Sequence, residues 1–346
     1  MPVRKRLRVG LICGGRSSEH DISLLSARAV AGHLDPHKYA VTPIFITREG
    51  AWRMNHKLLR SVWMTLDRLD VVLPILHGPY GEDGTIQGLL EMVGVPYVGA
   101  GVLGSAVAMD KEVTKRLWRQ AGLPVGPYVP ATRESWTAAG PSLAAEIEHR
   151  LRYPLFVKPA NLGSSVGISK VKRRSQLGAA LELALAYDPK VLVEQGLDAR
   201  ELECSVLGNR HPHASAPGEI LSGREFYDYA AKYASTGSRT LVPAPVSERV
   251  AARVQDLAVA AFQACECQGL ARVDFFLEKR TGKLYLNEMN TMPGFTAISM
   301  YPKLWEAEGL PLSALLDLMI ALALERAGER KGLGQPKGQK RAAIKL

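Results

Sequence analysis

Two stretches of alternating apolar and polar residues, near the end of the chain, limit the possible folds more than any other feature of the sequence. Residues 270–278 and 283–290 alternate with period two, which is typical of half-buried strands. The polar break at residues 280–283 predicts that they form a hairpin. In the second stretch the alternate positions are Leu284, Leu286, Glu288 and Asn290. Because alternate side chains share a face, we expect one face of the sheet to gather Arg272, Asp274, Glu288 and Asn290.

Two carboxylates and an amide on one sheet face suit a particular kind of ligand. Hard oxygen ligands bind Mg²⁺ held between protein and phosphate, and they do not suit zinc. The alternative is a solvated strand face with charges placed by chance, the usual explanation for a lone aspartate in a strand. That alternative leaves two observations unexplained: the acids lie within apolar runs, and a Pro293-Gly294 turn follows them directly.

Composition indicates a globular chain of two or three domains. The chain has 346 residues, of which 47% are hydrophobic, so it can bury a large core. The apolar stretch 310–324 contains Asp317 and is shorter than the roughly 20 residues that a bilayer span needs. The apolar run at residues 9–13 is too short for a signal-peptide core. Four cysteines in so long a chain are typical of reduced cytosolic thiols, so we expect a cytoplasmic protein without a membrane partner.

The net charge of +10 invites a nucleic-acid interpretation, but the charge is concentrated at the two ends. Residues 1–8 carry four basic and no acidic side chains, and residues 325–346 carry seven basic and two acidic ones. The body between them is nearly neutral, which argues against a basic groove that follows a phosphate backbone. We therefore expect no nucleic-acid partner, and a disordered basic tail at residues 327–346.

The chain opens with a strand, a glycine turn and a helix. Residues 8–13 predict a buried strand, two glycines follow at 14–15, and a helical pattern covers residues 22–34. Amides at the start of a helix bind anions, but the spacing is not Gly-x-Gly-x-x-Gly, and Glu19 adds a negative charge there. Glu19 suits an ammonium group better than a phosphate. The alternative, left open by this stretch alone, is an acid that stabilises the helix dipole.

Two further apolar runs, residues 39–46 and 71–76, predict buried strands. A glycine-rich loop and a helix at residues 85–93 follow the second run. This repeat of strand, loop and helix predicts an open parallel α/β sheet, whose ligands bind beyond the strand ends. His77 lies at such a strand end, where it either orients a substrate or caps the loop; the residues favour neither role.

The middle of the chain contains a candidate phosphate site. Helices are expected at residues 105–122 and 143–151, and Lys158 then closes an apolar strand before the sequence Gly-Ser-Ser-Val-Gly at 163–167. Flexible amides and hydroxyls can surround an anion while the ammonium supplies charge. The lysine precedes the glycines, so this is not a Walker loop, and alone it is a weak signal. A strand at 191–197 and an alternating stretch at 201–207 follow, where backbone groups could read an adenine and an acid could take ribose hydroxyls.

Seven motifs, in order from about Val9 to Ala323, together resemble the D-alanine–D-alanine ligase family of ATP-grasp enzymes. They lie at residues 14–23, 77–84, 109–111, 157–167, 225–233, 271–274 and 287–296. The resemblance implies an α/β ATP-grasp fold: an N-terminal open parallel (Rossmann-like) domain and two α+β subdomains that clasp ATP. The implied divisions are 1–104 for the substrate domain, 105–196 for the central subdomain with a phosphate lid, and 197–326 for the C-terminal subdomain with the metal site.

The family's chemistry implies a two-step reaction for peptidoglycan precursor synthesis. ATP phosphorylates the carboxylate of one D-alanine, and the amine of a second D-alanine attacks the acyl phosphate, which yields D-alanyl-D-alanine, ADP and phosphate. The resemblance also implies two Mg²⁺ (or Mn²⁺) ions, with Glu288 between them, and a homodimer. The implied metal ligands are Asp274, Glu288 and Asn290.

The resemblance assigns the remaining site residues as follows. ATP would be bound by Lys111, Lys158, Gly163, Ser164, Ser165, Val166, Glu194, Gln195, Leu197, Glu201, Lys232 and Phe276, with residues 163–166 as a lid that excludes water. Glu19 would pair with the ammonium of the first D-alanine, Arg272 and the Gly294 amide would stabilise the oxyanion, and His77 and Ser299 would position the second D-alanine. Glu19, Ser164 and Tyr233 would form a hydrogen-bonded link.

Three rival interpretations are weighed against this one. A dehydrogenase would need a dinucleotide fingerprint after the first strand, which Gly14-Gly15 does not provide. A nucleic-acid-binding protein would depend on the terminal charges. Another ATP-grasp ligase, including one that makes D-alanyl-D-lactate, is the nearest competitor. Relatives of that kind replace the loop at 225–233, so Tyr229, Lys232 and Tyr233 favour an amine acceptor. Leu162 is apolar where some relatives carry a charge.

Overall fold

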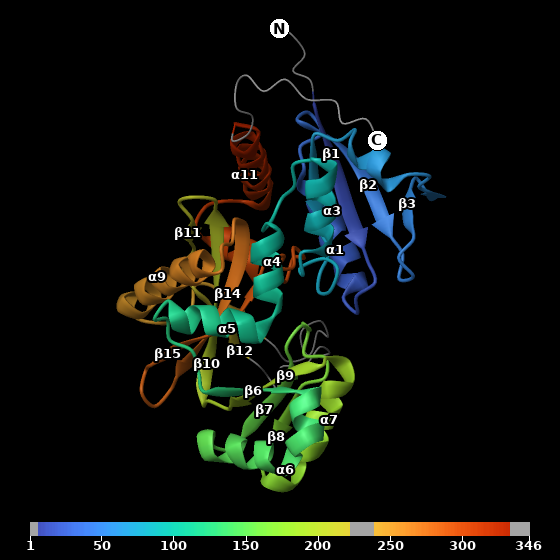
Figure 1. Ribbon diagram of the computed structural model, residues 1–346. Coiled ribbons are helices and arrows are strands. Elements are labelled where there is room, and N and C mark those ends of the chain that lie inside the picture. Colours follow the sequence, from blue (N-terminus) through green and yellow to red (C-terminus); the bar gives the residue numbers. More distant parts are fainter. Residues whose placement is uncertain (1–5, 222–238, 333–346) are drawn as a thin grey trace.

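Three β-sheets follow one another along the chain, and each packs against its own helices (Figure 1). The computed structural model describes residues 6–221 and 239–332. Each of the three expected ranges contains one sheet, so the α/β fold predicted from the sequence is confirmed. The division at residues 104, 196 and 326 remains a proposal.

The first sheet is mixed, with two parallel and two antiparallel strand pairs where the sequence predicted a parallel sheet, and it has helices on both faces. Its strand order is β4-β3-β2-β1-β5, with β1 parallel to both β2 and β5. The strands are β1 (Leu7–Gly14), β2 (Tyr39–Ile46), β3 (Trp52–Met54), β4 (Lys57–Leu58) and β5 (Val71–Pro74). Their helices are α1 (His20–His33), α2 (Val62–Leu66) and α3 (Thr85–Val93). Both apolar runs form strands, as predicted. The strand in the run 71–76 is buried but ends two residues early, whereas the strand at 39–46 is only partly buried.

The second sheet is antiparallel, in the order β6-β9-β7-β8. Its strands are β6 (Tyr128–Thr132), β7 (Leu155–Pro159), β8 (Ser169–Val171) and β9 (Lys190–Gln195). The helices are α6 (Arg133–Arg150) and α7 (Leu177–Tyr187), with a short 3₁₀ turn η1 (Arg174–Gln176) before α7. They share an apolar core with β7 and β9, separate from the cores of the other two sheets.

Helix α6 begins ten residues before the expected helix at 143–151. A capping box begins it, because Thr132 Oγ1 accepts from Ser135 N and Ser135 Oγ accepts from Thr132 N. Ala139 then leaves helical geometry (φ −149°), just before Pro141. The periodic pattern is broken at this kink, so only the second half was recognisable from the sequence.

The third sheet is also antiparallel, and it carries the predicted hairpin. Its order is β13-β12-β10-β14-β15, with β11 paired to β10. The strands are β10 (Ala199–Gly208), β11 (His213–Ala214), β12 (Gly218–Leu221), β13 (Arg239–Leu241), β14 (Gly269–Glu278) and β15 (Leu284–Asn290). Helix α9 (Glu248–Ala264) covers its apolar face.

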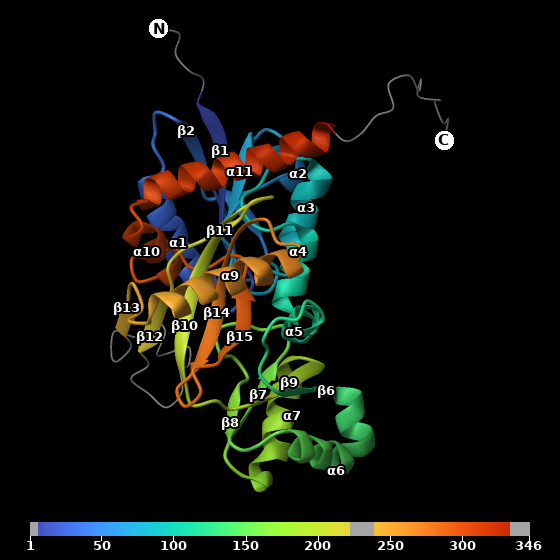
Figure 2. The same cartoon turned by 90° about the vertical axis from the view of Figure 1, so that its left-hand side faces the viewer.

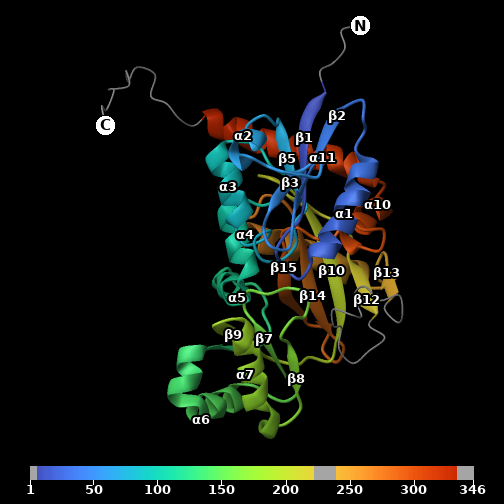
Figure 3. The same cartoon turned by 90° about the vertical axis from the view of Figure 1, so that its right-hand side faces the viewer.

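Two consecutive helices link the first sheet to the other two. Helices α4 (Val102–Met109) and α5 (Lys111–Gln120) replace the single helix expected at 105–122, because Asp110 caps a new helix and accepts from Val113 N at 3.0 Å. Figure 3 shows α3, α4 and α5 following one another along one edge of the molecule. Ala108 and Trp118 belong to the core of the third sheet, although they precede the second sheet in the sequence.

The last two helices return to the first sheet. Helix α10 (Met300–Ala307) is followed by α11 (Leu312–Gly332), which lies across the N-terminal sheet in Figure 2. The helix continues six residues beyond 326, so the expected tail is helical as far as Gly332. No single helix of the described residues is long and apolar enough to cross a bilayer; α10 and the first part of α11 pass that test only as a pair, bent by 104°.

Candidate active site

An open pocket with an empty volume of about 1120 Å³ lies where the three units meet. The expected site residues that line it are Glu19, His77, Lys111, Gly163, Ser164, Arg272, Glu288, Asn290, Gly294 and Ser299. The other expected residues in the described part of the chain do not line it: Lys158, Ser165, Val166, Glu194, Gln195, Leu197, Glu201, Asp274 and Phe276. The pocket therefore collects the residues expected at the substrates, but few of those expected at the nucleotide.

The register of the hairpin brings its four polar side chains together. Arg272 lies opposite Asn290, and Asp274 lies opposite Glu288, across the antiparallel pair β14–β15. Asn290 Nδ2 donates to Asp274 Oδ2 at 3.1 Å. The four side chains are thus neighbours on one face, as the alternation predicted, while the other face of β14 packs into the apolar core.

A β-bulge interrupts this hairpin. Next to the Asp274–Glu288 pair, Phe275 faces Leu286, which leaves Asn287 as an extra residue in β15. Leu286 packs with Phe275 in the core, and Glu288 lines the pocket. Regular alternation would have put Leu286 on the face of Glu288, so the expected pattern is wrong on this side of the bulge.

Arg272 is clamped between two carboxylates. Its Nε and Nη2 donate to Asp274 Oδ1 and Oδ2, both at 2.7 Å, and Nε lies 3.1 Å from Glu203 Oε2. Burial alone would lower the pKa of this guanidinium, but Asp274 and Glu203 outweigh burial and raise it. Glu203 faces Asp274 from β10 and lines the pocket, although the sequence analysis did not assign it. Its alternation with Glu201 could have indicated this position.

The hairpin group fits a hard cation only in part. Two carboxylates and an amide supply oxygen ligands of the kind that Mg²⁺ and Mn²⁺ prefer. Within residues 6–221 and 239–332, no group of three or more His, Cys, Asp or Glu side chains is arranged to hold a metal. Asp274, Glu288 and Asn290 would therefore need further oxygen ligands from outside the protein, such as those of phosphates.

Glu19 connects the first sheet to the loop after β7. Ser164 Oγ donates a hydrogen bond to Glu19 Oε1. Ser164 and the following Ser165 both adopt left-handed backbone geometry (φ 51° and 60°), which is uncommon for residues other than glycine. A Cβ on Gly78 would lie 2.6 Å from Glu19 Oε2, and one on Gly163 would lie 3.2 Å from it. Only glycine allows both backbones to approach this carboxylate so closely.

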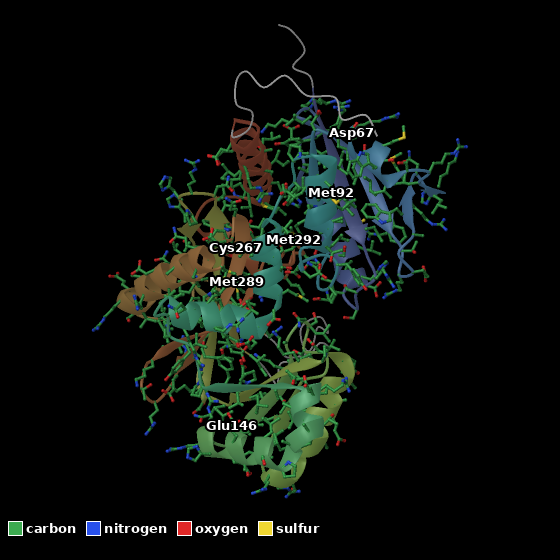
Figure 4. All side chains as sticks on the ribbon, viewed as in Figure 1. Asp67, Met92, Glu146, Cys267, Met289 and Met292 are labelled. Carbon is green, nitrogen blue, oxygen red and sulfur yellow. The ribbon has the colours of Figure 1, made fainter. Side chains whose placement is uncertain are left out.

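His77 is fixed on both ring nitrogens. Nδ1 donates to the Met292 carbonyl at 2.8 Å, and Nε2 lies 3.1 Å from Ser26 Oγ. Burial lowers the pKa of the His77 imidazole, although Glu19 opposes the shift. The ring therefore joins the end of β5 to the segment after β15, which includes Met292, labelled in Figure 4. His77 is anchored at its loop and also borders the pocket, so its position is compatible with both roles, capping the loop and orienting a substrate.

Glu82 makes a parallel connection that the sequence analysis missed. Its two carboxylate oxygens accept from the Gly78 and Met292 amides, each at 2.9 Å. Burial, with a further contribution from Glu19, raises the pKa of the Glu82 carboxyl to about 7. Its position within the motif at 77–84 was the available signal. The carboxylate holds the pocket's N-terminal loop to the segment that follows the hairpin.

Two lysines lie near the loop after β7: Lys111 lines the pocket, and Lys158 lies outside its lining. Lys111 Nζ donates to the Leu162 carbonyl at 2.6 Å and lies 3.9 Å from Glu288 Oε2. Lys158 Nζ lies 2.6 Å from Glu194 Oε2. Lys111 thus connects the loop after β7 to the hairpin, and both lysines can meet an anion between the second and third sheets.

The other residues expected at the nucleotide lie along the second and third sheets. Glu201 on β10 lies opposite Phe276 on β14. The side-chain oxygen of Gln195 accepts from Arg152 N at 3.0 Å, so this group is turned to its own sheet. Leu197 follows β9. Val166 N donates to Gly163 O at 3.3 Å, which closes a turn in the loop.

The segment after β15 presents Gly294 and Ser299 to the pocket. Ser299 Oγ accepts from Thr296 N at 3.0 Å and lies 2.8 Å from Thr296 Oγ1. A Cβ on Gly294 would lie 2.7 Å from Ser299 Oγ, so a larger residue would displace this hydroxyl. Tyr229, Lys232 and Tyr233, expected on the neighbouring loop, lie outside the described residues.

The fold and the pocket define an ATP-grasp ligase, in which two antiparallel sheets and a glycine-serine loop lie beside an α/β unit with a mixed sheet. Residues 117–321 match the family model "D-ala D-ala ligase C-terminus", and residues 8–64 and 60–100 match "D-ala D-ala ligase N-terminus". The chain belongs to the D-alanine–D-alanine ligase family. The expectation drawn from the seven motifs is thereby confirmed.

Individual relatives agree over almost the whole chain. The D-alanine–D-alanine ligase of Solibacter usitatus is 51% identical over 326 residues, covering 94% of this chain and 98% of the relative. The solved structure of the D-alanine-D-alanine ligase from Coxiella burnetii has a TM-score of 0.84 and 37% identity, covering 95% and 97% of the two chains. The VanG D-Ala:D-Ser ligase from Enterococcus faecalis has a TM-score of 0.83 and 36% identity, covering 92% and 100%.

Proposed function

We propose that this chain is an ATP-dependent ligase that joins two D-alanine molecules into D-alanyl-D-alanine for peptidoglycan precursor synthesis. The observation that supports it best is the meeting of three groups at one pocket. These are the Glu19–Ser164 pair, the Lys111–Glu288 contact and the polar face around Arg272. The Glu19–Ser164 pair suits an amino-acid ammonium, and the Lys111–Glu288 contact suits phosphate. The polar face around Arg272 suits the substrate carboxylate and the oxyanion that forms from it.

The first D-alanine is positioned by its ammonium and its carboxylate. Glu19 would pair with the ammonium, and its carboxylate is closely approached by the backbones of Gly78 and Gly163. The carboxylate of the substrate then faces Arg272 across the pocket. Because Arg272 is already held by Asp274 and Glu203, its guanidinium is oriented before the substrate arrives.

Phosphoryl transfer from ATP to that carboxylate is limited by charge repulsion, which the lysines reduce. Lys111 and Lys158 would pair with phosphate oxygens, and the resemblance to the family assigns Lys232 to the transferred group. Asp274, Glu288 and Asn290 would hold two Mg²⁺ or Mn²⁺ ions, which would neutralise phosphate charge when bound. Glu201 would take the ribose and Phe276 would pack on the purine, which puts the nucleotide between the second and third sheets.

The second step needs water to be excluded from the acyl phosphate. The loop at 163–166 is held over the pocket by Ser164 and by the bond from Lys111 to Leu162. The amine of the second D-alanine attacks the acyl carbon, its carboxylate is received at Ser299, and Arg272 with the Gly294 amide stabilises the oxyanion. Collapse of this intermediate releases phosphate and leaves the new amide bond.

The second substrate is the point at which ligases of similar structure differ. The likeness to a D-Ala:D-Ser ligase favours D-serine as the alternative acceptor, and D-lactate is the acceptor for the depsipeptide alternative. Both leave Glu19 and Arg272 in the same roles, because only the attacking molecule differs.

Phosphate release with ATP and Mg²⁺ tests the proposal directly. We expect release with D-alanine alone and none with L-alanine, with D-alanyl-D-alanine as the product by mass spectrometry. Preferential formation of the mixed product with D-serine or D-lactate would replace the proposed acceptor. ATP hydrolysis without any dipeptide would overturn the function. Repeating the assay after chelation of divalent ions, and with Mg²⁺ or Mn²⁺ restored, tests the metal assignment.

We further propose a homodimer that works in the cytoplasm. The four cysteines are free thiols, which agrees with a reducing compartment. Helices α3 and α4 expose Met92, labelled in Figure 4, and Leu103, with 73% and 60% of these residues accessible. Light scattering should give twice the mass of the chain, and Met92→Glu with Leu103→Glu should halve it. The matched control is Met64→Glu on α2, where the residue is 60% exposed.

A further inference from the structure

A buried triad of charges joins α5, β7 and β9, outside the residues that line the pocket. Lys115 Nζ on α5 lies 3.0 Å from Glu194 Oε1, and Lys158 Nζ on β7 lies 2.6 Å from Glu194 Oε2. The side chains of Lys115, Lys158 and Glu194 are 4%, 8% and 13% exposed. One carboxylate at the end of β9 is therefore shared by two ammoniums, one on each oxygen.

Sharing the carboxylate changes the charge that the triad presents to a ligand. A single Lys158–Glu194 pair would be neutral, and an ammonium so closely paired has little attraction left for an anion. With Lys115 on the other oxygen, the three groups together carry one net positive charge. In a site removed from water this charge is only weakly screened. The second lysine thereby supplies attraction for phosphate without touching it.

The directions in which the pKa values of Glu194 and Lys115 change agree with a carboxylate shared by two ammoniums. Burial would raise the pKa of Glu194, but Lys115 and Lys158 outweigh burial and lower it to about 2, so the carboxylate is charged at neutral pH. Burial lowers the pKa of Lys115, and Glu194 opposes that shift. Lys115 is not among the residues that line the pocket.

We propose that Lys115 is a positioning residue for ATP: by pairing with Glu194, it leaves Lys158 with net positive charge for the nucleotide phosphates. The inference rests on the proposed function, because it requires that the cleft binds ATP. It also gives Glu194 a different role from the adenine or ribose contact expected from the sequence. Glu194 acts through Lys158, and Lys115 acts through Glu194.

The alternative is that Lys115 only neutralises a buried carboxylate and so maintains the fold. A double-mutant cycle separates the two, using Lys115→Met, Glu194→Gln and the combined variant. If Lys115 acts by balancing Glu194, its removal matters only while the carboxylate is present. A purely structural lysine would instead affect stability, both substrates and the turnover rate together.

The experiment measures KM for ATP, KM for D-alanine, kcat and ADP affinity by calorimetry in the full-length chain. Lys115→Met should raise KM for ATP roughly tenfold, the loss expected when one charge-assisted hydrogen bond is weakened. KM for D-alanine should change less than twofold. In the Glu194→Gln background, the same substitution should change KM for ATP less than twofold. Arg116→Met is the matched control, since Arg116 is the next residue of α5 and its side chain is 67% exposed.

Equal effects of Lys115→Met in both backgrounds, or a parallel loss in both KM values, kcat and thermal stability, would overturn the inference. If Lys115→Met alone does not fold, the comparison of Glu194→Gln with the double variant still tests the inference, because a difference of more than twofold in KM for ATP between them would overturn it. Failure of the proposed function is recognised separately. In that case the wild-type protein would make no dipeptide, while the calorimetric pattern for ADP would still report on Lys115.

Discussion

At the scale of single residues, Glu19 shows how the site depends on contacts from several segments. Its carboxylate accepts from Ser164 and packs against the backbones of Gly78 and Gly163. The ring of His77 and the carboxylate of Glu82 fix the loop that contains Gly78. The group proposed to bind the substrate ammonium is therefore oriented by the loop that we propose as a lid, and we expect binding and closure to be coupled.

Ser164→Ala tests this coupling. The variant loses a hydrogen bond to a charged acceptor, which typically contributes about 1.5–3 kcal/mol. We expect kcat to fall roughly tenfold or more, because the loop would be held less firmly over the acyl phosphate. Steady-state kinetics with ATP and D-alanine measure the effect, and Ser18→Ala, which removes an exposed hydroxyl nearby, is the control. Full activity of Ser164→Ala would show that the link is dispensable.

The pKa of Glu194, lowered to about 2 from 4.5, predicts a dependence of stability on pH. A carboxyl whose pKa is lowered by folding stabilises the native state above its unfolded pKa, and that contribution disappears as the pH falls toward 2. Each pH unit in this window corresponds to about 1.4 kcal/mol. The stability difference between wild type and Glu194→Gln should therefore shrink between pH 5 and pH 3 in denaturant titrations.

The control for this titration is Glu146→Gln on α6, labelled in Figure 4, whose partner Arg150 is a surface residue. Its side chain is 53% exposed, so solvent screens the pair and the stability difference should stay small at every pH. A Glu194→Gln difference that does not change with pH would contradict the buried triad.

The neighbours of a site residue could be predicted where a motif contained them. They could not be predicted where contacts join segments that are distant in the sequence. Arg272, Asp274 and Asn290 were predicted to share a sheet face, and they do. The pairing of Lys115 with Glu194 was not predicted, because α5 and β9 are far apart in the chain and neither residue belongs to a recognisable pattern. Local periodicity contains no information about such a meeting.

At the scale of elements, the bulge at Asn287 is the feature that regular alternation could not predict. Period two fixes the faces of a strand only while the ladder is continuous. An extra residue exchanges the faces on one side, which lets Leu286 enter the core while Glu288 stays in the pocket. The same limit applies to α6, where a kink at Ala139 hid the first half of the helix.

Deletion of Asn287 tests the bulge. Without the extra residue, either Glu288 must enter the core or Leu286 must leave it, and each costs several kcal/mol. We expect a large loss of thermal stability and no measurable dipeptide synthesis. Asn287→Ala keeps the bulge and removes only the 3.5 Å contact from Lys158 Nζ to Asn287 Oδ1, so it should retain the fold. A deletion variant with wild-type activity would mean that the register is set elsewhere.

At the scale of the whole molecule, the apolar cores divide the chain differently from its sheets. One cluster joins Leu11 of the first sheet, Leu270 of the third sheet and Leu316 of α11. The second sheet has its own cluster, which includes Leu181 of α7. The first and third sheets should therefore behave as one cooperative body, to which the second sheet is attached as a separate unit beneath the pocket.

Leu316→Ala and Leu181→Ala form a matched pair that tests this division, because both leucines are fully buried in helices. Each substitution should cost about 2–5 kcal/mol in its own cluster. Native-state hydrogen exchange should show that Leu316→Ala lowers the protection of β1 and β14 together and spares β7 and β9, whereas Leu181→Ala does the reverse. If both variants lowered protection uniformly, the molecule would unfold as one unit, and closure of the pocket could not occur by movement of the second sheet against a rigid remainder.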